Sequence, residues 1–384
     1  MPNAETFLTV AAAHDLGDFE HAAAAVLSRD VWDFVAGGSG GELTLAANRT
    51  ALERLFVIPR TLRDVSECST VSTLLGRPVA LPLAVAPVAY HRLVHPDGER
   101  AVARAAKAAG VPFAAAMLSS VPIEEITEVG GAVWFQMYWL RDRAKTLDLA
   151  RRAENAGCEA LMLTVDVPWM GRRLRDVRNG FALPDGVRAA NLNAGAETTA
   201  NRQTLGVSAV ATHTTLAFSA AVTWACVAEL RSVTRLPIVL KGILAPQDAA
   251  RAVEFGVDAV VVSNHGGRQL DGAIPSADAL AGVAAAVGGK CEVWMDGGIR
   301  GGSDVLKALV LGADGVLVGR PPIWGLAAAG EAGVARVLDL LADEFHNALG
   351  LAGCDGVVAA RQLRIHREAA GHAAGLTRHA APVR

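Results

Sequence analysis

Short apolar runs alternate with helical segments through residues 81–320 of the chain. The runs are apolar at successive positions, without a polar alternation, which is typical of strands covered on both faces. They comprise residues 81–87, 111–117, 131–138, 159–168, 236–242, 257–266, 291–298 and 313–320. The segments between them have helical patterns, as in 98–110, 141–157 and 246–256, and several end in glycine. Eight repeats of strand and helix predict an α/β fold, a (β/α)8 TIM barrel, rather than a doubly wound sheet.

The first 80 residues precede the first predicted barrel strand. They contain helical patterns at 19–27 and 28–36, and then the glycine-rich sequence GGSGG at 37–41. We expect this segment to cap one end of the barrel.

A long insertion separates the fourth and fifth predicted strands. Residues 168–221 exceed a usual βα loop and include a polar, turn-prone tract at 193–204. Because loops of this length are often functional, we expect a mobile lid here. The whole chain is predicted to be one domain, made of a cap (1–80), a barrel (81–350) and a C-terminal tail (351–384).

The composition excludes several classes of protein. The chain has 384 residues, 52% hydrophobic and 20% charged, and its 36 basic and 39 acidic residues give a net charge of −3. A large core is therefore expected, and there is no basic footprint for nucleic acid. The mean hydropathy of +0.30 comes mainly from alanine, and charges interrupt each apolar run before it reaches membrane-spanning length.

The cysteines and the N-terminus point to the cytoplasm. The five cysteines are far apart, form no metal-ligand pattern, and are best explained as thiols in a reducing compartment. The N-terminus lacks the basic start of a secretory signal. We therefore expect a cytoplasmic protein without a bound metal.

Polar residues follow six of the eight predicted strands. In a barrel, the carboxyl ends of all strands meet at one mouth, where catalytic residues lie. One polar strand end is unremarkable, but six facing the same mouth indicate an active site. The residues are Gln136, Tyr138, Thr164, Asp166, Lys241, Ser263, Asn264, His265, Asp296, Gly319 and Arg320.

The strongest local motif is SNHGGRQLDG, residues 263–272. An isolated histidine is more often a packed core residue, but a Gly-Gly turn at a strand end favours a catalytic His265. A neutral histidine is a suitable general base near pH 7. Arg268 can bind a carboxylate with two donors, and Asp166 can orient the imidazole.

Two further tracts indicate anion binding. The loop 166–181 is rich in arginine, and at a barrel mouth one of these guanidinium groups is expected to bind an anion rather than only to be solvated. The sequences DGGIRGGSD (296–304) and GRPPIWG (319–325) are glycine-rich turns that lead into helices after strands seven and eight. These loops are the usual phosphate site of barrels.

These motifs resemble the FMN-dependent 2-hydroxy-acid oxidase and dehydrogenase family, which includes glycolate and lactate oxidases. The resemblance extends from about residue 18 to about residue 363, and SNHGGRQLDG with DGGIRGGSDVLKAL and VGRP is its most specific part. WDFVAGGSGG and DVPWMGRRLRDVRNGFALP are most similar to the members that act on mandelates in antibiotic biosynthesis. The family's barrel fold and FMN cofactor are therefore expected.

The resemblance implies specific roles for the substrate side of the site. His265 is expected to be the base, with Asp166 as its partner. Arg268 and Arg173 are expected to hold the substrate carboxylate, and Tyr138 to hydrogen-bond the substrate near its hydroxyl.

The resemblance also implies the residues that bind the cofactor. Lys241 is expected beside the flavin ring, where it stabilises the reduced anion. The ring and ribityl chain are expected on Pro87, Val88, Ala89, Ser119, Gln136, Thr164 and Ser263. The phosphate is expected on Asp296, Gly298, Arg300, Gly319 and Arg320.

Two positions depart from the family pattern and favour an aromatic substrate. Phe34 stands where many members have a tyrosine that helps to bind the carboxylate. Val121 follows the LSS motif where glycolate oxidase-like members have a tryptophan, and we expect it to leave room for a ring.

We therefore expect oxidation of an (S)-2-hydroxy acid, mandelate or 4-hydroxymandelate, to the 2-keto acid, with O2 reduced to hydrogen peroxide. His265 takes either the hydroxyl proton, with hydride transfer from C2, or the C2 proton. Alternatives are a lactate- or glycolate-type oxidase and a soluble dehydrogenase with another electron acceptor. A barrel isomerase or a binding module would not need this set of residues. The family implies a homo-tetramer, with no membrane or nucleic-acid partner.

Overall fold

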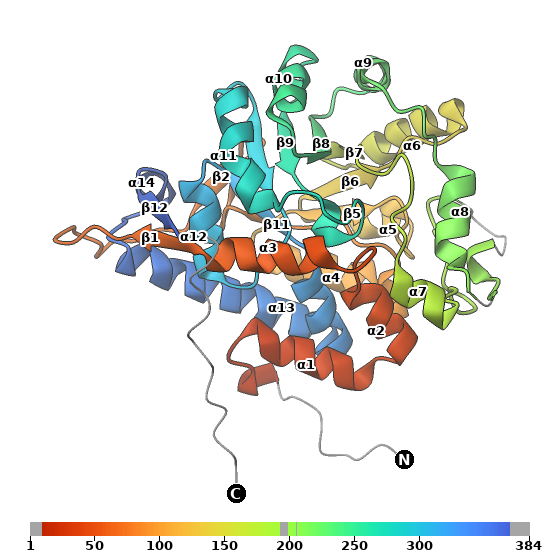
Figure 1. Cartoon of the computed structure of the whole chain (residues 1–384), viewed down its shortest axis with the longest axis horizontal. Coiled ribbons are helices and arrows are strands. Elements are labelled where there is room, and N and C mark those ends of the chain that lie inside the picture. The colour runs from red at the N-terminus through yellow and green to blue at the C-terminus, as the bar shows by residue number, and fades with distance from the viewer. Residues whose placement is uncertain (1–9, 193–198, 205, 369–384) are drawn as a thin grey trace, which may run out of the picture.

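The computed structural model describes residues 10–192, 199–204 and 206–368. Within these ranges, eight parallel strands close into a barrel in which each strand pairs with the next along the chain and the last pairs with the first (Figure 1). Each strand overlaps one predicted apolar run, so the predicted TIM barrel is confirmed. The strands are β4 (Leu83–Val85), β5 (Phe113–Ala116), β6 (Val133–Met137), β7 (Ala160–Thr164), β8 (Ile238–Ile243), β9 (Ala259–Val262), β10 (Glu292–Met295) and β11 (Gly315–Val318).

The barrel interior is filled by side chains from all eight strands. Trp134 of β6 stacks on Trp294 of β10, with ring centroids 4.8 Å apart. A hairpin of β2 (Ser72–Leu74) and β3 (Arg77–Val79) packs Leu74 against this cluster. The hairpin closes the end of the barrel at which the strands begin, so the open mouth lies at their carboxyl ends.

Helices cover the outside of the barrel. The predicted helices at 98–110, 141–157 and 246–256 correspond to α4, α6 and α10. The long α13 is broken near Gly330, whose φ of +60° and close approach to His95 favour glycine. No helix among the described residues is long and apolar enough to cross a membrane. The surrounding helices are α4 (Glu99–Ala108), α5 (Ile123–Thr127), α6 (Arg143–Asn155), α9 (Trp224–Val233), α10 (Pro246–Glu254), α11 (Ser276–Val287), α12 (Gly302–Val310), α13 (Arg320–Leu351) and α14 (Val357–Ala360).

The N-terminal segment contacts both ends of the barrel. The predicted helical stretches correspond to α1 (Leu16–Val26) and α2 (Arg29–Ala36), and a further helix, α3 (Leu43–Glu53), was not predicted. The glycine-rich turn reaches the mouth, where the backbone N–H of Ser39 donates to the carbonyl of Gly267 at 2.9 Å. The β2–β3 hairpin lies at the opposite end, so the segment does more than cap one end.

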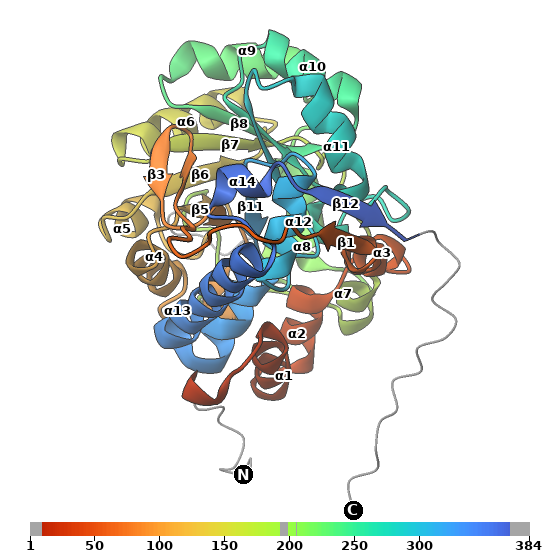
Figure 2. The ribbon, with the colours of Figure 1, turned by 90° about the vertical axis from the view of Figure 1, so that its left-hand side faces the viewer.

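A strand near the end of the N-terminal segment pairs with the last strand of the described chain in a small sheet. Strand β1 (Leu55–Ile58) pairs antiparallel with β12 (Arg364–Arg367), and the two ribbons lie side by side in Figure 2. Neither strand was predicted. Residues 369–384 of the predicted C-terminal tail lie outside the described residues.

The insertion between β7 and β8 contains helices α7 (Leu174–Asn179) and α8 (Ala209–Ala217). Asp33 of α2 holds α7, because it accepts a hydrogen bond from Asn179 at 2.9 Å and pairs with Arg175 at 3.3 Å. Within the polar tract, residues 193–198 lie outside the described residues, as does residue 205. The predicted movement of this lid stays a prediction.

Candidate active site

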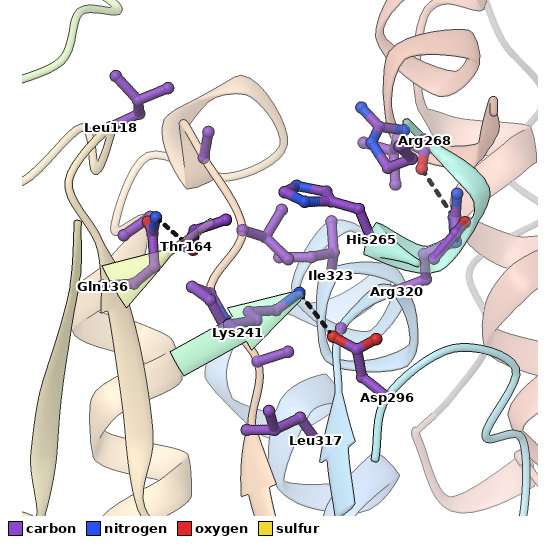
Figure 3. Close-up of a pocket in the computed structure, with 18 of the residues that line it drawn as sticks. Leu118, Gln136, Thr164, Lys241, His265, Arg268, Asp296, Leu317, Arg320 and Ile323 are labelled. Carbon is purple, nitrogen blue, oxygen red and sulfur yellow. Dashed lines mark hydrogen bonds and ion pairs between the residues drawn. The ribbon is translucent and has the colours of Figure 1, made fainter. Parts of the chain in front are cut away.

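A cavity of about 1200 Å³, partly open to solvent, lies at the mouth of the barrel (Figure 3). Most of the predicted site residues line it, although they come from strands and loops far apart in the chain. These lining residues are Phe34, Pro87, Val88, Ala89, Gln136, Tyr138, Thr164, Arg173, Lys241, His265, Arg268, Asp296, Gly298, Arg300, Gly319 and Arg320. The residues predicted to form the site are therefore brought together around this one cavity.

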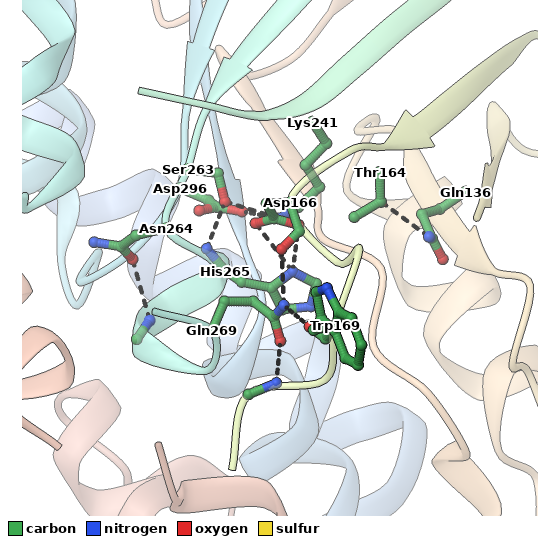
Figure 4. A network of polar contacts seen from close by, with 12 residues as sticks. Gln136, Thr164, Asp166, Trp169, Lys241, Ser263, Asn264, His265, Gln269 and Asp296 are labelled. Atoms are coloured by element: carbon green, nitrogen blue, oxygen red, sulfur yellow. Dashed lines mark hydrogen bonds and ion pairs between the residues drawn. The ribbon is translucent and has the colours of Figure 1, made fainter. Parts of the chain in front are cut away.

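His265, which lines the cavity, forms a hydrogen-bonded pair with Asp166, which lies behind it (Figure 4). The Nδ1 atom of His265 lies 3.0 and 3.2 Å from the two carboxylate oxygens of Asp166. Burial lowers the pKa of His265 and Asp166 opposes this, with a net lowering. Burial raises the pKa of Asp166, but the opposing effects of His265 and Lys241 are together larger, and the net result is a lowered pKa. The carboxylate therefore stays ionised. The imidazole is therefore neutral at pH 7, with Nε2 free of the carboxylate.

The backbone of the HGG turn aims His265 at the cavity. His265, Gly266 and Gly267 have consecutive φ values of +59°, +62° and +76°. A side chain at Gly267 would place its Cβ 2.6 Å from Cα of Leu45, so this turn requires glycine. The strained backbone of His265, a non-glycine residue, is of the kind found at functional sites.

Lys241 lies beside the same pair. Its Nζ atom is 2.7 Å from Oδ2 of Asp296 and donates to Oγ of Ser263 at 2.9 Å. Ser263 Oγ also accepts the backbone N–H of His265 at 3.0 Å. Burial lowers the pKa of Lys241, but Asp296 and Asp166 raise it above its usual value. Lys241 is therefore a fixed cation at the floor of the cavity.

Arg173 and Arg268 converge on Phe34. Their guanidinium carbons lie 5.8 and 5.4 Å from the centre of the Phe34 ring, which itself stacks on Phe181. Burial lowers the pKa of both arginines. Arg268 donates to the carbonyl of Gly37 at 2.7 Å, and neither arginine forms an ion pair with a carboxylate of the described residues. The Asp176 carboxylate acts on both arginines without forming an ion pair with either, and the two half-buried guanidinium groups are suited to bind a carboxylate anion.

A second pair of half-buried arginines, Arg300 and Arg320, also lines the cavity, and these are the arginines predicted to bind the phosphate. Arg320, at the start of α13, donates to the carbonyls of Val35 and Gly266 at 3.1 Å each and of Gly37 at 3.0 Å. Arg300 stacks on Trp324, with its guanidinium carbon 4.6 Å from the ring centre. Burial lowers the pKa of Arg300 to about 10 and that of Arg320 to about 9. Within the described chain neither has a carboxylate partner, so this pair too is suited to bind an anion.

FMN fits this donor set. The predicted phosphate site offers two arginines, the amino terminus of α13 and the glycine backbone at 297–298, where a Cβ on Gly298 would lie 2.8 Å from the carbonyl oxygen of Asn48. Oδ1 of Asp296 is buried without a partner among the described residues and can accept from a ribityl hydroxyl. Gln136, which donates to Oγ1 of Thr164 at 2.9 Å, and Lys241 supply polar groups for the ring.

Four predicted residues do not line the cavity. Asp166 and Ser263 lie behind it, where each is hydrogen-bonded to His265, whereas Ser119 and Val121 lie in the core. The Ser119 side chain is fully buried and donates to the carbonyl of Ala116 at 2.5 Å. Val121 is also fully buried and belongs to the core between strands and helices. The chain turns away from the cavity after Leu118, towards α5, so the expectation that Val121 leaves room for a substrate ring is wrong.

Several residues of the site were not predicted. Tyr90 and Leu118 form the wall expected at Val121, and Met170, Val210, Thr214 and Phe218 contribute from the insertion. Gln269 positions the loop after β7, because its Nε2 donates to the carbonyls of Asp166 at 2.7 Å and Trp169 at 2.8 Å (Figure 4). In the sequence, the position of Gln269 directly after the HGGR motif was the feature that could have indicated this role.

Gly242 is a further unpredicted residue of the site. It follows Lys241 in β8 with φ +110°, and an added Cβ would lie 2.6 Å from both Cβ and Cγ of Asp166. Its glycine permits the close approach of the Asp166 carboxylate. The position was visible in the sequence only as the Lys-Gly pair at a strand end.

Known proteins are similar along nearly the whole chain. Residues 23–367 match the family model described as FMN-dependent dehydrogenase. The chain is 62% identical over 348 residues to a 4-hydroxymandelate oxidase of Amycolatopsis orientalis, covering 91% of this chain and 97% of that protein. It is 47% identical over 349 residues to an L-lactate oxidase of a Nostoc species, covering 88% and 94%. A crystal structure of mandelate oxidase with (S)-4-hydroxymandelic acid matches with a TM-score of 0.91 and 61% identity, over 92% of this chain and 99% of that one.

Proposed function

Because the chain belongs to the FMN-dependent dehydrogenase family, we propose that it oxidises an aromatic (S)-2-hydroxy acid to the 2-keto acid and reduces O2 to hydrogen peroxide. The substrates we propose are (S)-mandelate and (S)-4-hydroxymandelate. The similarity to a 4-hydroxymandelate oxidase and to a mandelate oxidase structure supports this choice.

One feature of the cavity supports this chemistry most directly. The neutral imidazole of His265 and the half-buried guanidinium groups of Arg268 and Arg173 line the same cavity. A 2-hydroxy acid carries a carboxylate on the carbon that also bears its hydroxyl and the hydrogen to be removed. The two arginines bind that carboxylate, and the bound acid then presents its reacting carbon to His265.

His265 holds the proton that leaves the substrate. Its Nδ1 faces Asp166 at 3.0 Å, so Nε2 accepts the proton. The Asp166 carboxylate stabilises the imidazolium that forms and fixes the ring orientation. When bound, FMN accepts the two electrons of the oxidation. The Lys241 ammonium, held by Asp296, supplies positive charge beside the reduced ring.

The remaining wall of the cavity suits an aryl group. Leu118, Met170, Val210 and Phe218 line it, and Tyr138 stacks on Phe218 with ring centroids 4.3 Å apart. Burying a phenyl ring against such a wall contributes about 25 cal/mol per Å² of apolar area. This gain exceeds the roughly 1 kcal/mol of one neutral hydrogen bond, so an aromatic acid should be preferred to lactate or glycolate.

The test is flavin bleaching by a panel of 2-hydroxy acids. The purified yellow protein is mixed anaerobically with (S)-mandelate, (S)-4-hydroxymandelate, (S)-lactate and glycolate, and the loss of flavin absorbance is followed. We expect the aromatic acids to give at least about tenfold higher kcat/KM, a difference of about 1.4 kcal/mol. Faster turnover of lactate or glycolate would refute the aromatic assignment, and no bleaching by any acid would refute the reaction itself.

Peroxide formation tests the electron acceptor. In air, hydrogen peroxide should form in equal amount to the keto acid. Turnover that requires an added dye or quinone, without peroxide, would instead support a dehydrogenase.

We also propose that the enzyme is a single-domain homo-tetramer of the cytoplasm that serves antibiotic biosynthesis. The family resemblance supports the assembly and the biological role, and the five unpaired cysteines agree with a reducing compartment. Light scattering of the purified protein that gives the mass of a monomer would refute the tetramer.

A further inference from the structure

Tyr90 is a polar residue of the cavity for which the proposed reaction has no use. Its side chain is 1% exposed and lines the cavity, and its hydroxyl has no hydrogen-bond partner among the described residues. The residue adopts the left-handed conformation, with φ +59° and ψ +53°. Both the buried hydroxyl and the strained backbone are costly, which is the pattern expected of a residue kept for binding.

The backbone places Tyr90 beside Leu118 in the wall of the cavity. Its N–H donates to the carbonyl of Leu118 at 3.1 Å, so the two residues share one wall. Figure 3 shows Leu118 across the cavity from His265 and Arg268. A 2-hydroxy acid with its carboxylate on the arginines and its reacting carbon at His265 therefore directs its side chain toward Leu118 and Tyr90.

The charges that act on the two tyrosines of the cavity agree with this placement. Burial raises the pKa of both. The pKa of Tyr138 is also affected by the charges of Asp166, Arg173 and Arg268. Of these three charges, Arg173 also affects the pKa of Tyr90. The Arg173 charge therefore acts on both tyrosines, and the Asp166 and Arg268 charges act on Tyr138. With its pKa raised, the Tyr90 hydroxyl keeps its proton across the ordinary assay range.

We infer that Tyr90 determines specificity by hydrogen-bonding a hydroxyl group at the far end of the substrate's ring, so that the site favours 4-hydroxymandelate over mandelate. The inference rests on the proposed function and adds the ring substituent to it. The neighbouring side chains Leu118, Val210 and Phe218 are apolar, so within this wall the Tyr90 phenol is a suitable partner for a ring hydroxyl. An unsubstituted ring leaves that phenol unpaired, and this disfavours mandelate.

The experiment compares Tyr90→Phe with Tyr138→Phe on three substrates. The substrates are (S)-4-hydroxymandelate, (S)-mandelate and (S)-4-methylmandelate, the last of which fills the para position without a hydrogen bond. In Tyr90→Phe, the kcat/KM ratio of 4-hydroxymandelate to mandelate should fall about fivefold to tenfold, the equivalent of one hydrogen bond. The ratio of 4-methylmandelate to mandelate should not fall. Tyr138→Phe, the same chemical change at the tyrosine on which the Asp166 and Arg268 charges act, should lower kcat/KM for all three substrates together.

Three results would overturn the inference. Equal losses for all substrates in Tyr90→Phe would place its hydroxyl on the carboxylate or the 2-hydroxyl. An unchanged ratio would mean that the hydroxyl contacts no ring substituent. A parallel fall for 4-methylmandelate would indicate altered packing. FMN content and melting temperature of each variant establish that it is folded. Failure of the proposed function is distinct, since it appears in the wild-type enzyme as absent bleaching with every acid.

Discussion

The substitution Gly242→Ala tests whether the close approach of β8 to Asp166 is needed for catalysis. The added Cβ would lie 2.6 Å from Cβ and Cγ of Asp166 and 3.0 Å from its backbone nitrogen. Ordinary van der Waals contact begins at 3.4 Å, so the carboxylate or the strand must move by about 0.8 Å. Asp166 holds His265 at 3.0 Å, so this movement misplaces the base.

The expected effect is large on the reaction and moderate on stability. Misplacing a catalytic group by about 1 Å costs roughly 10²-fold, so flavin reduction at saturating substrate should slow by about 10- to 100-fold. The positive φ of +110° at this position adds backbone strain of about 1–3 kcal/mol to the folded state. Anaerobic stopped-flow reduction of the FMN-loaded variant measures the first effect, and its unfolding free energy measures the second.

Gly157→Ala is the matched control. Gly157 has φ +91°, and an added Cβ there meets nothing within 4 Å. It should lose stability through the same strain and reduce flavin at the wild-type rate. If Gly242→Ala also reduced flavin at the wild-type rate, Asp166 would not need its observed position, and the role given to the pair would be wrong.

Three other outcomes are expected. His265→Ala should keep FMN and slow flavin reduction by roughly 10²–10⁴-fold, and reduction near the wild-type rate would exclude it as the base. Arg268→Lys should raise KM and lower kcat together, because an ammonium lacks the planar two-donor fork, and equal turnover of substrate esters would argue against carboxylate binding. Because burial lowers the pKa of His265, kcat/KM should stay constant as the pH falls through 6.5 and decline only at lower pH. Asp166→Asn removes a charge that raises this pKa, so the decline should occur at a still lower pH. A decline of the wild-type kcat/KM above pH 6.5 would contradict the assignment.

The lowered pKa of His265 also makes the free energy of unfolding depend on pH. The unfolded chain binds a proton at this histidine near pH 6.5, before the folded chain does. The stability that comes from keeping it neutral is therefore present above pH 6.5 and is lost as the pH falls below that value.

The barrel and the mouth of the site could be predicted because their signals are local. Each strand is a short apolar run, and the residues directly after it must lie at one end of a parallel barrel. His265, Lys241 and Asp296 follow this rule. The helix α3, which was not predicted, is held by long-range contacts such as the paired amides of Asn48 and Asn264 at 2.9 and 2.7 Å.

The wall that meets the substrate's ring could not be predicted, because it depends on the path of the chain in space. Val121 follows the LSS motif, yet the chain turns at Leu118 and buries Val121 in the core. Tyr90, thirty-one positions earlier, occupies the wall through a backbone hydrogen bond to Leu118. No periodicity or spacing in the sequence encodes that pairing.

The charges at the mouth of the barrel link the proposed cofactor site to the proposed substrate site. Partial burial lowers the pKa values of four half-buried arginines, which contact carbonyls and aromatic rings and form no ion pairs with carboxylates of the described residues: Arg173, Arg268, Arg300 and Arg320. The carbonyl of Gly37 accepts from both Arg268 and Arg320 and so links the two pairs. Desolvated cations are stabilised by any anion that reaches them. We propose that the FMN phosphate offsets the charge of Arg300 and Arg320 and that the substrate carboxylate offsets that of Arg173 and Arg268, so that the reacting carbon of the bound acid faces His265.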